Sequence, residues 1–187
     1  MTVYMEALHE LGLKKLLRYI FFSVWSIIFD WMFLPPLRTF WLKLFGAHVG
    51  KGVVFGQVRL INIHHSGLRN LQVGDYSVIS DNVSLDLADQ IAFGKHTAIG
   101  EGAIFSTHMK IGYSTHPLQK YFPPKKAPIK VGDGCFIGAG AIILSGVRLG
   151  TGTMIPAGTV INRSVLDWTL VYDTPQRTLI PIKNKNT

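Results

Sequence analysis

The chain has 187 residues, of which 48% are hydrophobic and 16% are charged, and its mean hydropathy is +0.26. This length allows one domain with a buried core, and the 19 glycines are spread along the chain, which argues against a disordered linker. The net charge of +8 suits nucleic acid, anionic lipid or a phosphate-rich cofactor as a partner. Cys135 is the only cysteine, so an intrachain disulfide is excluded and a reducing compartment is the default.

The first 45 residues form a hydrophobic segment with helical spacing. Three basic residues precede an aromatic-rich stretch over residues 19–29, which Asp30 interrupts and Pro35-Pro36 ends. Apolar side chains then recur at helical spacing over residues 37–45. No small-residue cleavage site of a signal peptide follows, and the apolar run is shorter than the roughly 20 residues of a membrane span.

We therefore expect residues 1–45 to form a helical segment at a membrane surface, with tryptophans at the headgroup level and basic side chains against anionic lipid. A helix packed on the main domain or on a partner subunit is the alternative. The membrane interpretation predicts a cytoplasmic protein, peripheral at the inner face of the cytoplasmic membrane.

After Gly46 the helical spacing gives way to a repeat of six residues. Apolar residues follow this period at Val131, Ile137, Ile143, Leu149, Ile155 and Ile161, at Val73, Ile79 and Leu85, at Phe93, Ile99, Phe105 and Ile111, and more weakly at Val49, Phe55 and Ile61. A strict period of six does not fit an α-helix, and β-hairpins would show longer spacing. It fits a three-sided parallel β-helix, in which each apolar residue points into the bore. Short strands of a β-sandwich are the alternative.

With these repeats, residues 46–177 resemble the hexapeptide-repeat acyltransferases. The resemblance is closest to the maltose and galactoside O-acetyltransferases and to the O-acetyltransferases of bacterial surface polysaccharides. It implies a mainly β fold, a left-handed parallel β-helix, acetyl-CoA as acyl donor, and a homotrimer with the active site between subunits. The expected organisation is a helical segment over 1–45, a β-helix over 46–177 with an extruded loop at 117–128, and a tail over 178–187.

The repeat is interrupted between Ile111 and Val131, where Pro123-Pro124 and Lys125-Lys126 indicate a loop. The residues before this loop resemble the family stretch that ends in Thr-x-Thr-His-Pro. His116 matches the histidine of that stretch and is the first candidate for the catalytic base, with His108 as the second. A neutral imidazole can take the proton of a sugar hydroxyl as its oxygen attacks a thioester.

Acceptor contacts are suggested at two positions. Asn82 matches a family position that hydrogen-bonds the acceptor. Asp86, and equally Asp89, could orient either a sugar or a histidine. Ordinary turn residues are the alternative for all three.

The resemblance also implies cofactor contacts. The segment from Cys135 to Gly150 resembles the family's cofactor groove, in which small residues admit pantetheine. The implied contacts are Gly138, Ala139 and Ala157 for pantetheine, Asn162 and Arg163 near a phosphate of CoA, and Arg177 in a C-terminal motif. Asp173 stands where that motif usually has glycine, and a solvated basic face is the alternative for the arginines.

The function that combines these features is acetyl-CoA-dependent O-acetylation of a sugar hydroxyl by direct transfer, on a surface polysaccharide or lipid-linked saccharide. The alternatives are an acetyltransferase for a free small molecule (a sugar, serine or an antibiotic) and a non-enzymatic β-helix scaffold. We expect no zinc site, because tyrosines occupy positions 113 and 121, five residues after His108 and His116. We expect no nucleic-acid binding, because the basic residues form no stripe with aromatic residues.

Overall fold

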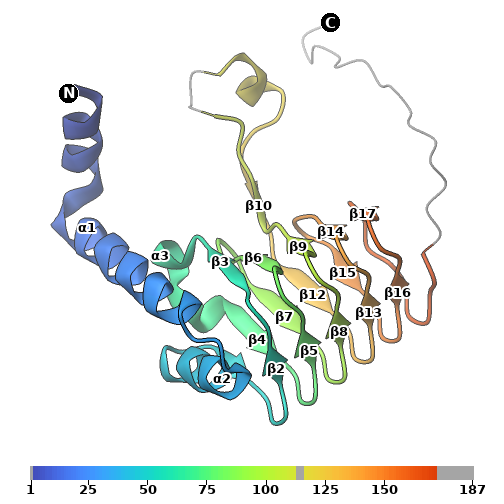
Figure 1. Cartoon of the computed structure of the whole chain (residues 1–187). Coiled ribbons are helices and arrows are strands. Elements are labelled where there is room, and N and C mark those ends of the chain that lie inside the picture. The colour runs from blue at the N-terminus through green and yellow to red at the C-terminus, as the bar shows by residue number, and fades with distance from the viewer. Residues whose placement is uncertain (1, 113–115, 172–187) are drawn as a thin grey trace, which may run out of the picture.

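A computed structural model of the chain describes residues 2–112 and 116–171, with side chains from residue 16 onward except that of residue 65. Most of these residues form a left-handed parallel β-helix with three flat sides. Two helices lie at the end where the β-helix begins, and an arm projects from its middle (Figure 1).

Each side of the β-helix is a parallel sheet of five short strands. Face A contains β1 (His48–Val49), β4 (Leu71–Val73), β7 (Ile91–Phe93), β12 (Ile129–Val131) and β15 (Arg148–Leu149). Face B contains β2 (Val54–Phe55), β5 (Val78–Ile79), β8 (Ala98–Ile99), β13 (Phe136–Ile137) and β16 (Met154–Ile155). Face C contains β3 (Arg59–Ile61), β6 (Ser84–Asp86), β9 (Ile104–Phe105), β14 (Ile142–Ile143) and β17 (Val160–Ile161).

The hexapeptide positions form three apolar columns inside the β-helix. Strand register aligns Val49, Val73, Phe93, Val131 and Leu149 on face A, Phe55, Ile79, Ile99, Ile137 and Ile155 on face B, and Leu60, Leu85, Phe105, Ile143 and Ile161 on face C. From the second coil onward, each of these side chains is at most 5% exposed. The β-helix predicted from the period of six is therefore confirmed, and stacking of the coils buries a continuous core.

Two residues assigned to the repeat do not point inward. Ile61 is exposed, and Leu60 takes the column position beside Leu85, because the first coil has one residue fewer between its columns on faces B and C. Ile111 lies six residues after Phe105 but is only half-buried, since the chain has already left the coil there. The last inward side chain before the interruption is that of Phe105.

The extruded arm lies between β9 and β12. It contains the antiparallel pair β10 (His108–Met109) and β11 (Lys125–Lys126) and the short helix η2 (Pro117–Lys120). The arm thus leaves the β-helix at residue 108, earlier than the predicted loop 117–128. It projects clearly from the stack of coils in Figure 1.

The N-terminal segment forms α1 (Thr2–Asp30) and α2 (Pro35–Leu44), which pack at the first coil (Figure 1). Pro35 and Pro36 occupy the first turn of α2, where the missing N–H groups would have no helical partner. Helix α2 contacts β1 and β2, and aromatic rings join the two helices, with Trp25 of α1 stacked on Trp41 of α2 at 6.5 Å between ring centroids. The first coil is therefore covered by α2. A short helix α3 (Ile63–Ser66) and a single turn η1 (Gly67–Asn70) follow β3.

Aspartates and glycines form the corners between coils. The carboxylate of Asp133 accepts a hydrogen bond from the backbone N–H of Lys95 at 2.8 Å. A Cβ on the neighbouring Gly94 would lie 2.6 Å from the backbone nitrogen of Asp133. Glycine is therefore required there by the close approach of two coils, which explains part of the glycine content.

Candidate active site

His108 and Asp86 form a paired imidazole and carboxylate where the arm leaves face C. The Nδ1 atom of His108 lies 2.5 Å from Oδ2 of Asp86. Asp86 ends β6, and His108 begins β10 after the buried turn residue Thr107. Residues 22 positions apart meet because consecutive coils stack in register. The sequence left open whether Asp86 orients a sugar or a histidine, and the structure pairs it with His108.

Asp86 is held by several hydrogen bonds besides that of His108. Oδ1 accepts from the side-chain amide of Asn62 at 2.7 Å and from the backbone N–H of Ala88 at 3.1 Å. Oδ2 accepts from the backbone N–H of Thr107 at 2.9 Å, from its hydroxyl at 3.1 Å, and from the N–H of His108 at 3.1 Å. These bonds fix the carboxylate in one position.

The environment of Asp86 keeps its carboxylate charged. Burial alone would raise the pKa of Asp86, but the hydrogen bonds from Asn62, His108 and Ala88 and the charge of His108 outweigh burial and lower this pKa below its usual value. The side chain of Asp86 is 6% exposed, whereas that of His108 is 41% exposed. A buried anion thus binds one ring nitrogen of an accessible imidazole. This arrangement fixes the tautomer and leaves Nε2 to exchange a proton with a bound molecule.

His116 has a different environment. It precedes η2 in the arm, and its Nδ1 accepts a hydrogen bond from the backbone N–H of Leu118 at 3.2 Å. The ring is exposed, and among the described residues no carboxylate forms an ion pair with it. The structure therefore gives His116 a helix-capping contact and gives His108 the carboxylate partner.

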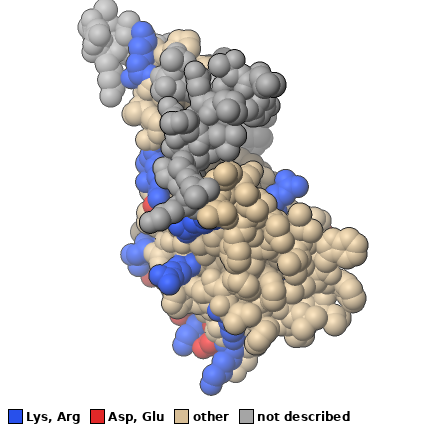
Figure 2. All heavy atoms as spheres, turned by 90° about the vertical axis from the view of Figure 1, so that its left-hand side faces the viewer, with Lys and Arg blue, Asp and Glu red and all other residues tan. Residues whose placement is uncertain are grey.

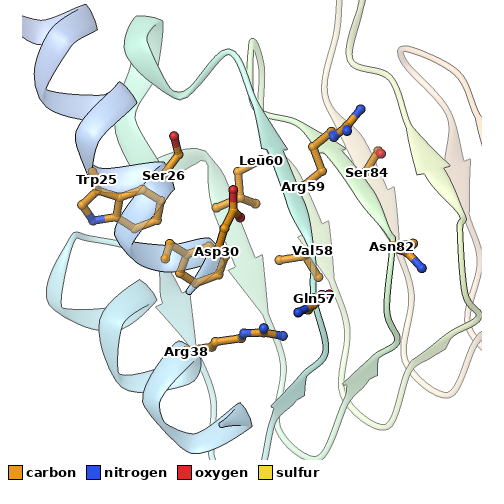
Figure 3. A pocket seen from close by; sticks show the side chains of 11 residues that line it. Trp25, Ser26, Asp30, Arg38, Gln57, Val58, Arg59, Leu60, Asn82 and Ser84 are labelled. Carbon is orange, nitrogen blue, oxygen red and sulfur yellow. The ribbon is translucent and has the colours of Figure 1, made fainter. Parts of the chain in front are cut away.

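Asn82 lies at a corner between faces B and C with φ of +60°, a conformation that asparagine tolerates better than most residues. It lines a cleft of about 600 Å³ between α1, α2 and the start of face C, which we call the helix cleft. Figure 3 shows Asn82 and Ser84 on the β-helix side of this cleft and Asp30 and Arg38 on the helix side.

A second cleft of about 430 Å³ adjoins the helix cleft and shares Arg59 and Leu60 with it. Its lining includes Asn62, the residue that donates a hydrogen bond to Asp86. The two clefts therefore extend along α1 to the carboxylate side of the His108–Asp86 pair.

The small residues assigned to the cofactor lie together. Ala139 and Ala157 are exposed at the same corner of successive coils, where the N–H of Gly158 donates to the carbonyl of Ala139 at 2.8 Å. Gly138 is buried beside them, and a Cβ there would lie 2.6 Å from the backbone of Pro156. Coil stacking thus accounts for glycine at 138, while Ala139 and Ala157 place only methyl groups at the exposed corner.

Asn162 and Arg163 are exposed after β17, at the opposite edge of face C from Ala157. His108 leaves the β-helix at the same edge. Strands β9 and β17 are two coils apart, so His108 and Asn162 are separated by roughly 10 Å along the stack at the usual strand spacing. The two sets of cofactor residues therefore bracket face C rather than share one corner. Arg177 lies outside the described residues.

Several residues of this region were not foreseen from the sequence. Asn62 and Thr107 hold Asp86, and Arg38 and Arg59 line the helix cleft. Coil register could have indicated Thr107: once Leu85 and Phe105 share a column, Asp86 lies beside the residues that follow Phe105. Nothing in the helical spacing of residues 37–45 distinguished Arg38. Within the described ranges, no three His, Cys, Asp or Glu side chains form a metal-binding group.

Comparisons with known proteins agree with this architecture. Residues 128–163 match the family described as bacterial transferase hexapeptide (six repeats). The WcaF protein of Escherichia coli (strain K12), named as a colanic acid biosynthesis acetyltransferase, is 30% identical over 148 residues, or 78% of this chain and 76% of WcaF.

Solved structures show the same fold. The hexapeptide-repeat acetyltransferase VCA0836 of Vibrio cholerae has a TM-score of 0.73 and 21% identity, covering 92% of this chain and 95% of that one, and another structure of it holds acetyl coenzyme A. A maltose O-acetyltransferase of Clostridium difficile 630 has a TM-score of 0.72 and 19% identity, covering 92% of this chain and 90% of that one. The match to WcaF, together with the repeats, shows that the chain belongs to the family of hexapeptide-repeat acetyltransferases.

Proposed function

We propose that the protein transfers an acetyl group from acetyl-CoA to a hydroxyl of a saccharide, with His108 as general base. The observation that carries this proposal is the 2.5 Å contact between Nδ1 of His108 and the buried carboxylate of Asp86. With Nδ1 bound in this way, Nε2 accepts the hydroxyl proton as the oxygen attacks the thioester carbonyl. Asp86 stabilises the imidazolium that forms, and His108 then returns the proton to the thiolate of CoA.

His108 replaces His116 as our first candidate because of the partner that each ring has. The resemblance to the Thr-x-Thr-His-Pro stretch favoured His116, but the hydrogen bond of its ring to the described residues is with a backbone N–H, not with a carboxylate. A carboxylate stabilises an imidazole that acquires a proton during the reaction, because the interaction between them strengthens when the imidazole becomes charged. A backbone N–H that donates to the ring gives no such stabilisation.

Acetyl-CoA is proposed to lie along face C. Acetyl coenzyme A is present in a structure of VCA0836. In this chain Ala139 and Ala157 offer an exposed corner with small side chains for pantetheine, and Arg163 offers a guanidinium for phosphate at the opposite edge. Asn162 and Arg177 complete the proposed contacts, and Gly138 supports the corner from within.

A saccharide acceptor is favoured by the lining of the helix cleft. Asn82, Ser84 and Gln57 present amide and hydroxyl groups that suit sugar hydroxyls. The similarity to WcaF, named for colanic acid biosynthesis, and to a maltose O-acetyltransferase favours a saccharide over serine or an antibiotic. A surface polysaccharide or its lipid-linked precursor is the acceptor that we propose.

A homotrimer is proposed from the outward side chains of face B. These are Val54, Val78, Ala98, Phe136 and Met154, aligned by register and all apolar. The corresponding side chains of face A are His48, Gln72, Ala92, Lys130 and Arg148. A continuous apolar stripe on one side of a β-helix is typical of an interface between copies of the chain.

Attachment to a membrane surface is proposed from α1 and α2. Among the described residues, no helix is long and apolar enough to cross a membrane. Trp31 and Phe33, in the connection between the helices, are 80% and 79% exposed, and Leu37 and Phe40 of α2 are exposed beside them. The side of the molecule on which these helices lie has a broad area without charged side chains, with Lys and Arg along its edge (Figure 2). Exposed aromatic side chains with basic neighbours suit an anionic lipid surface.

The proposed reaction is tested by measuring CoA release from acetyl-CoA over a panel of acceptors. We expect turnover with mono- or oligosaccharides, and none above background with serine or an aminoglycoside. Turnover confined to a non-saccharide acceptor would instead establish the small-molecule alternative.

A further inference from the structure

Arg38 is a buried cation without a carboxylate partner among the described residues. Its side chain is 2% exposed, and its Nε donates to the backbone carbonyl of Met32. Within the described part of the chain, the only ion pairs within 4.0 Å are Lys95–Asp75 and His108–Asp86. An unpaired charge inside a protein is unfavourable, so a guanidinium in this position calls for an anion to accompany it.

The guanidinium of Arg38 faces the helix cleft. Figure 3 shows it extending from α2 toward the corner that carries Gln57. Arg59 lines the same cleft from β3, and Asp30 is the single acidic residue of its lining. The remaining polar lining is neutral. The cleft therefore has an excess of positive charge together with groups that bind hydroxyls.

This cleft lies close to the His108–Asp86 pair. Ser84 of its lining and Asp86 are two residues apart in β6, so they share one side of the strand and lie roughly 7 Å apart. Arg59 pairs with Ser84 in register, on the neighbouring strand. A saccharide of one or two rings could therefore contact both Arg59 and His108.

We propose that the acceptor is an anionic saccharide, whose phosphate or carboxylate is attracted into the helix cleft by the positive charges of Arg38 and Arg59 while one of its hydroxyls reaches His108. The inference rests on the proposed function, since it identifies the chemical class of the acceptor. Guanidinium groups bind phosphate and carboxylate through pairs of parallel hydrogen bonds. Arg38, already fixed through its Nε, has its terminal amino groups available for such a pair.

The test compares three acceptors that share one sugar: the glycosyl phosphate, the uronic acid and the neutral methyl glycoside. Binding to the full-length protein is measured by calorimetry without acetyl-CoA, and kcat/KM for each acceptor is measured by CoA release. Arg38→Gln and Arg59→Gln are compared with wild type, with Lys51→Gln as the matched control because Lys51 is an exposed cation outside the cleft.

We expect one of the anionic sugars to bind at least about 10-fold more tightly than the methyl glycoside, and the preferred sugar identifies the anion. Each cleft variant should lose 10- to 100-fold in affinity for that sugar, as expected for a charge-assisted hydrogen-bonded pair, with neutral-sugar binding unchanged. Equal binding of the three sugars would overturn the inference, as would an equal loss for charged and neutral sugars in both cleft variants. If Arg38→Gln fails to fold, Arg59→Gln, at an exposed position, decides the question.

The two proposals can fail separately. Binding preference without any acetyl transfer would leave the anion site standing and contradict the proposed reaction. Acetyl transfer to saccharides without a preference for charge would support the reaction and overturn the anion site.

Discussion

Replacing Asp86 by asparagine removes the negative charge next to His108 with minimal change of shape. Oδ2 of Asp86 accepts hydrogen bonds from the backbone N–H and the hydroxyl of Thr107 and from the backbone N–H of His108, and it contacts Nδ1 of His108. Oδ1 accepts hydrogen bonds from Asn62 and Ala88. An asparagine fits best with its carbonyl in the place of Oδ2. Its amino group then takes the place of Oδ1 and faces two donors, the side-chain amide of Asn62 and the backbone N–H of Ala88. The N–H of Ala88 cannot rotate away, so it loses its hydrogen-bond acceptor.

The structure sets the size of both effects. An unsatisfied buried donor lowers the free energy of unfolding by about 1–3 kcal/mol, so Asp86→Asn should be destabilised by about that amount. The loss of the charge that stabilises the imidazolium is worth about 1.5–3 kcal/mol, which corresponds to a decrease in kcat of roughly 10- to 150-fold. KM for acetyl-CoA should change little, because Asp86 is buried, at 4% exposed, and is not among the residues proposed to bind the cofactor.

The assay is steady-state CoA release by folded protein, with Asp89→Asn as the control. Asp89 is three residues away, and its carboxylate accepts only from the backbone N–H of Gln90 among the described contacts. Asp89→Asn should retain most of the wild-type kcat. If Asp86→Asn is folded and keeps more than half of the wild-type kcat, the role given to the carboxylate is refuted.

The same variant has a predicted dependence on pH. Because the pKa of Asp86 is lowered in the folded protein, its ionised form contributes stability above the unfolded pKa of about 3.9. That contribution is lost as pH falls below about 4 through the folded pKa. The free energy of unfolding of Asp86→Asn should therefore decrease less steeply in acid than that of wild type.

Three further predictions concern the core, the assembly and the membrane. Ile137→Ala should lower the free energy of unfolding by about 2–5 kcal/mol in denaturant titrations, because Ile137 is fully buried in the column of face B. A smaller loss would contradict this core position. Phe136→Glu, one residue away on the outer side, should reduce the mass in sedimentation from three chains toward the 20.8 kDa of one, and an unchanged trimer would place the interface elsewhere. Wild type should float with vesicles of anionic phospholipid, and the double variant Trp31→Ser, Phe33→Ser should bind them on the order of 100-fold more weakly. Equal flotation of the two proteins would favour packing of the helices on protein.

The β-helix could be predicted from the sequence because its physical cause is local and repeated. Every sixth residue must fill a narrow bore, so the apolar period records the architecture directly. The errors arose where the coil length changes. Ile61 and Ile111 keep the period of six in the sequence, but a shorter first coil and the departure of the arm after Phe105 remove both from the columns.

The site was harder to predict because it depends on stacking between coils. Both histidines and Asp86 were candidates from the sequence, but the choice between the rings depended on which of them meets the carboxylate. That contact requires the register of β6 with β9 and the turn at Thr107. Arg38 was missed for a similar reason, since its burial results from packing of α2 on the first coil rather than from its local sequence.

The central claim is that the ring paired with Asp86 performs the proton transfer. It is tested most directly by comparing acetyl transfer to a saccharide by folded His108→Ala and His116→Ala proteins. We predict that His108→Ala loses about 100-fold or more in kcat, as for a general base, and that His116→Ala stays within a few-fold of wild type. Full activity of His108→Ala together with an inactive His116→Ala would contradict the account and assign the base to His116.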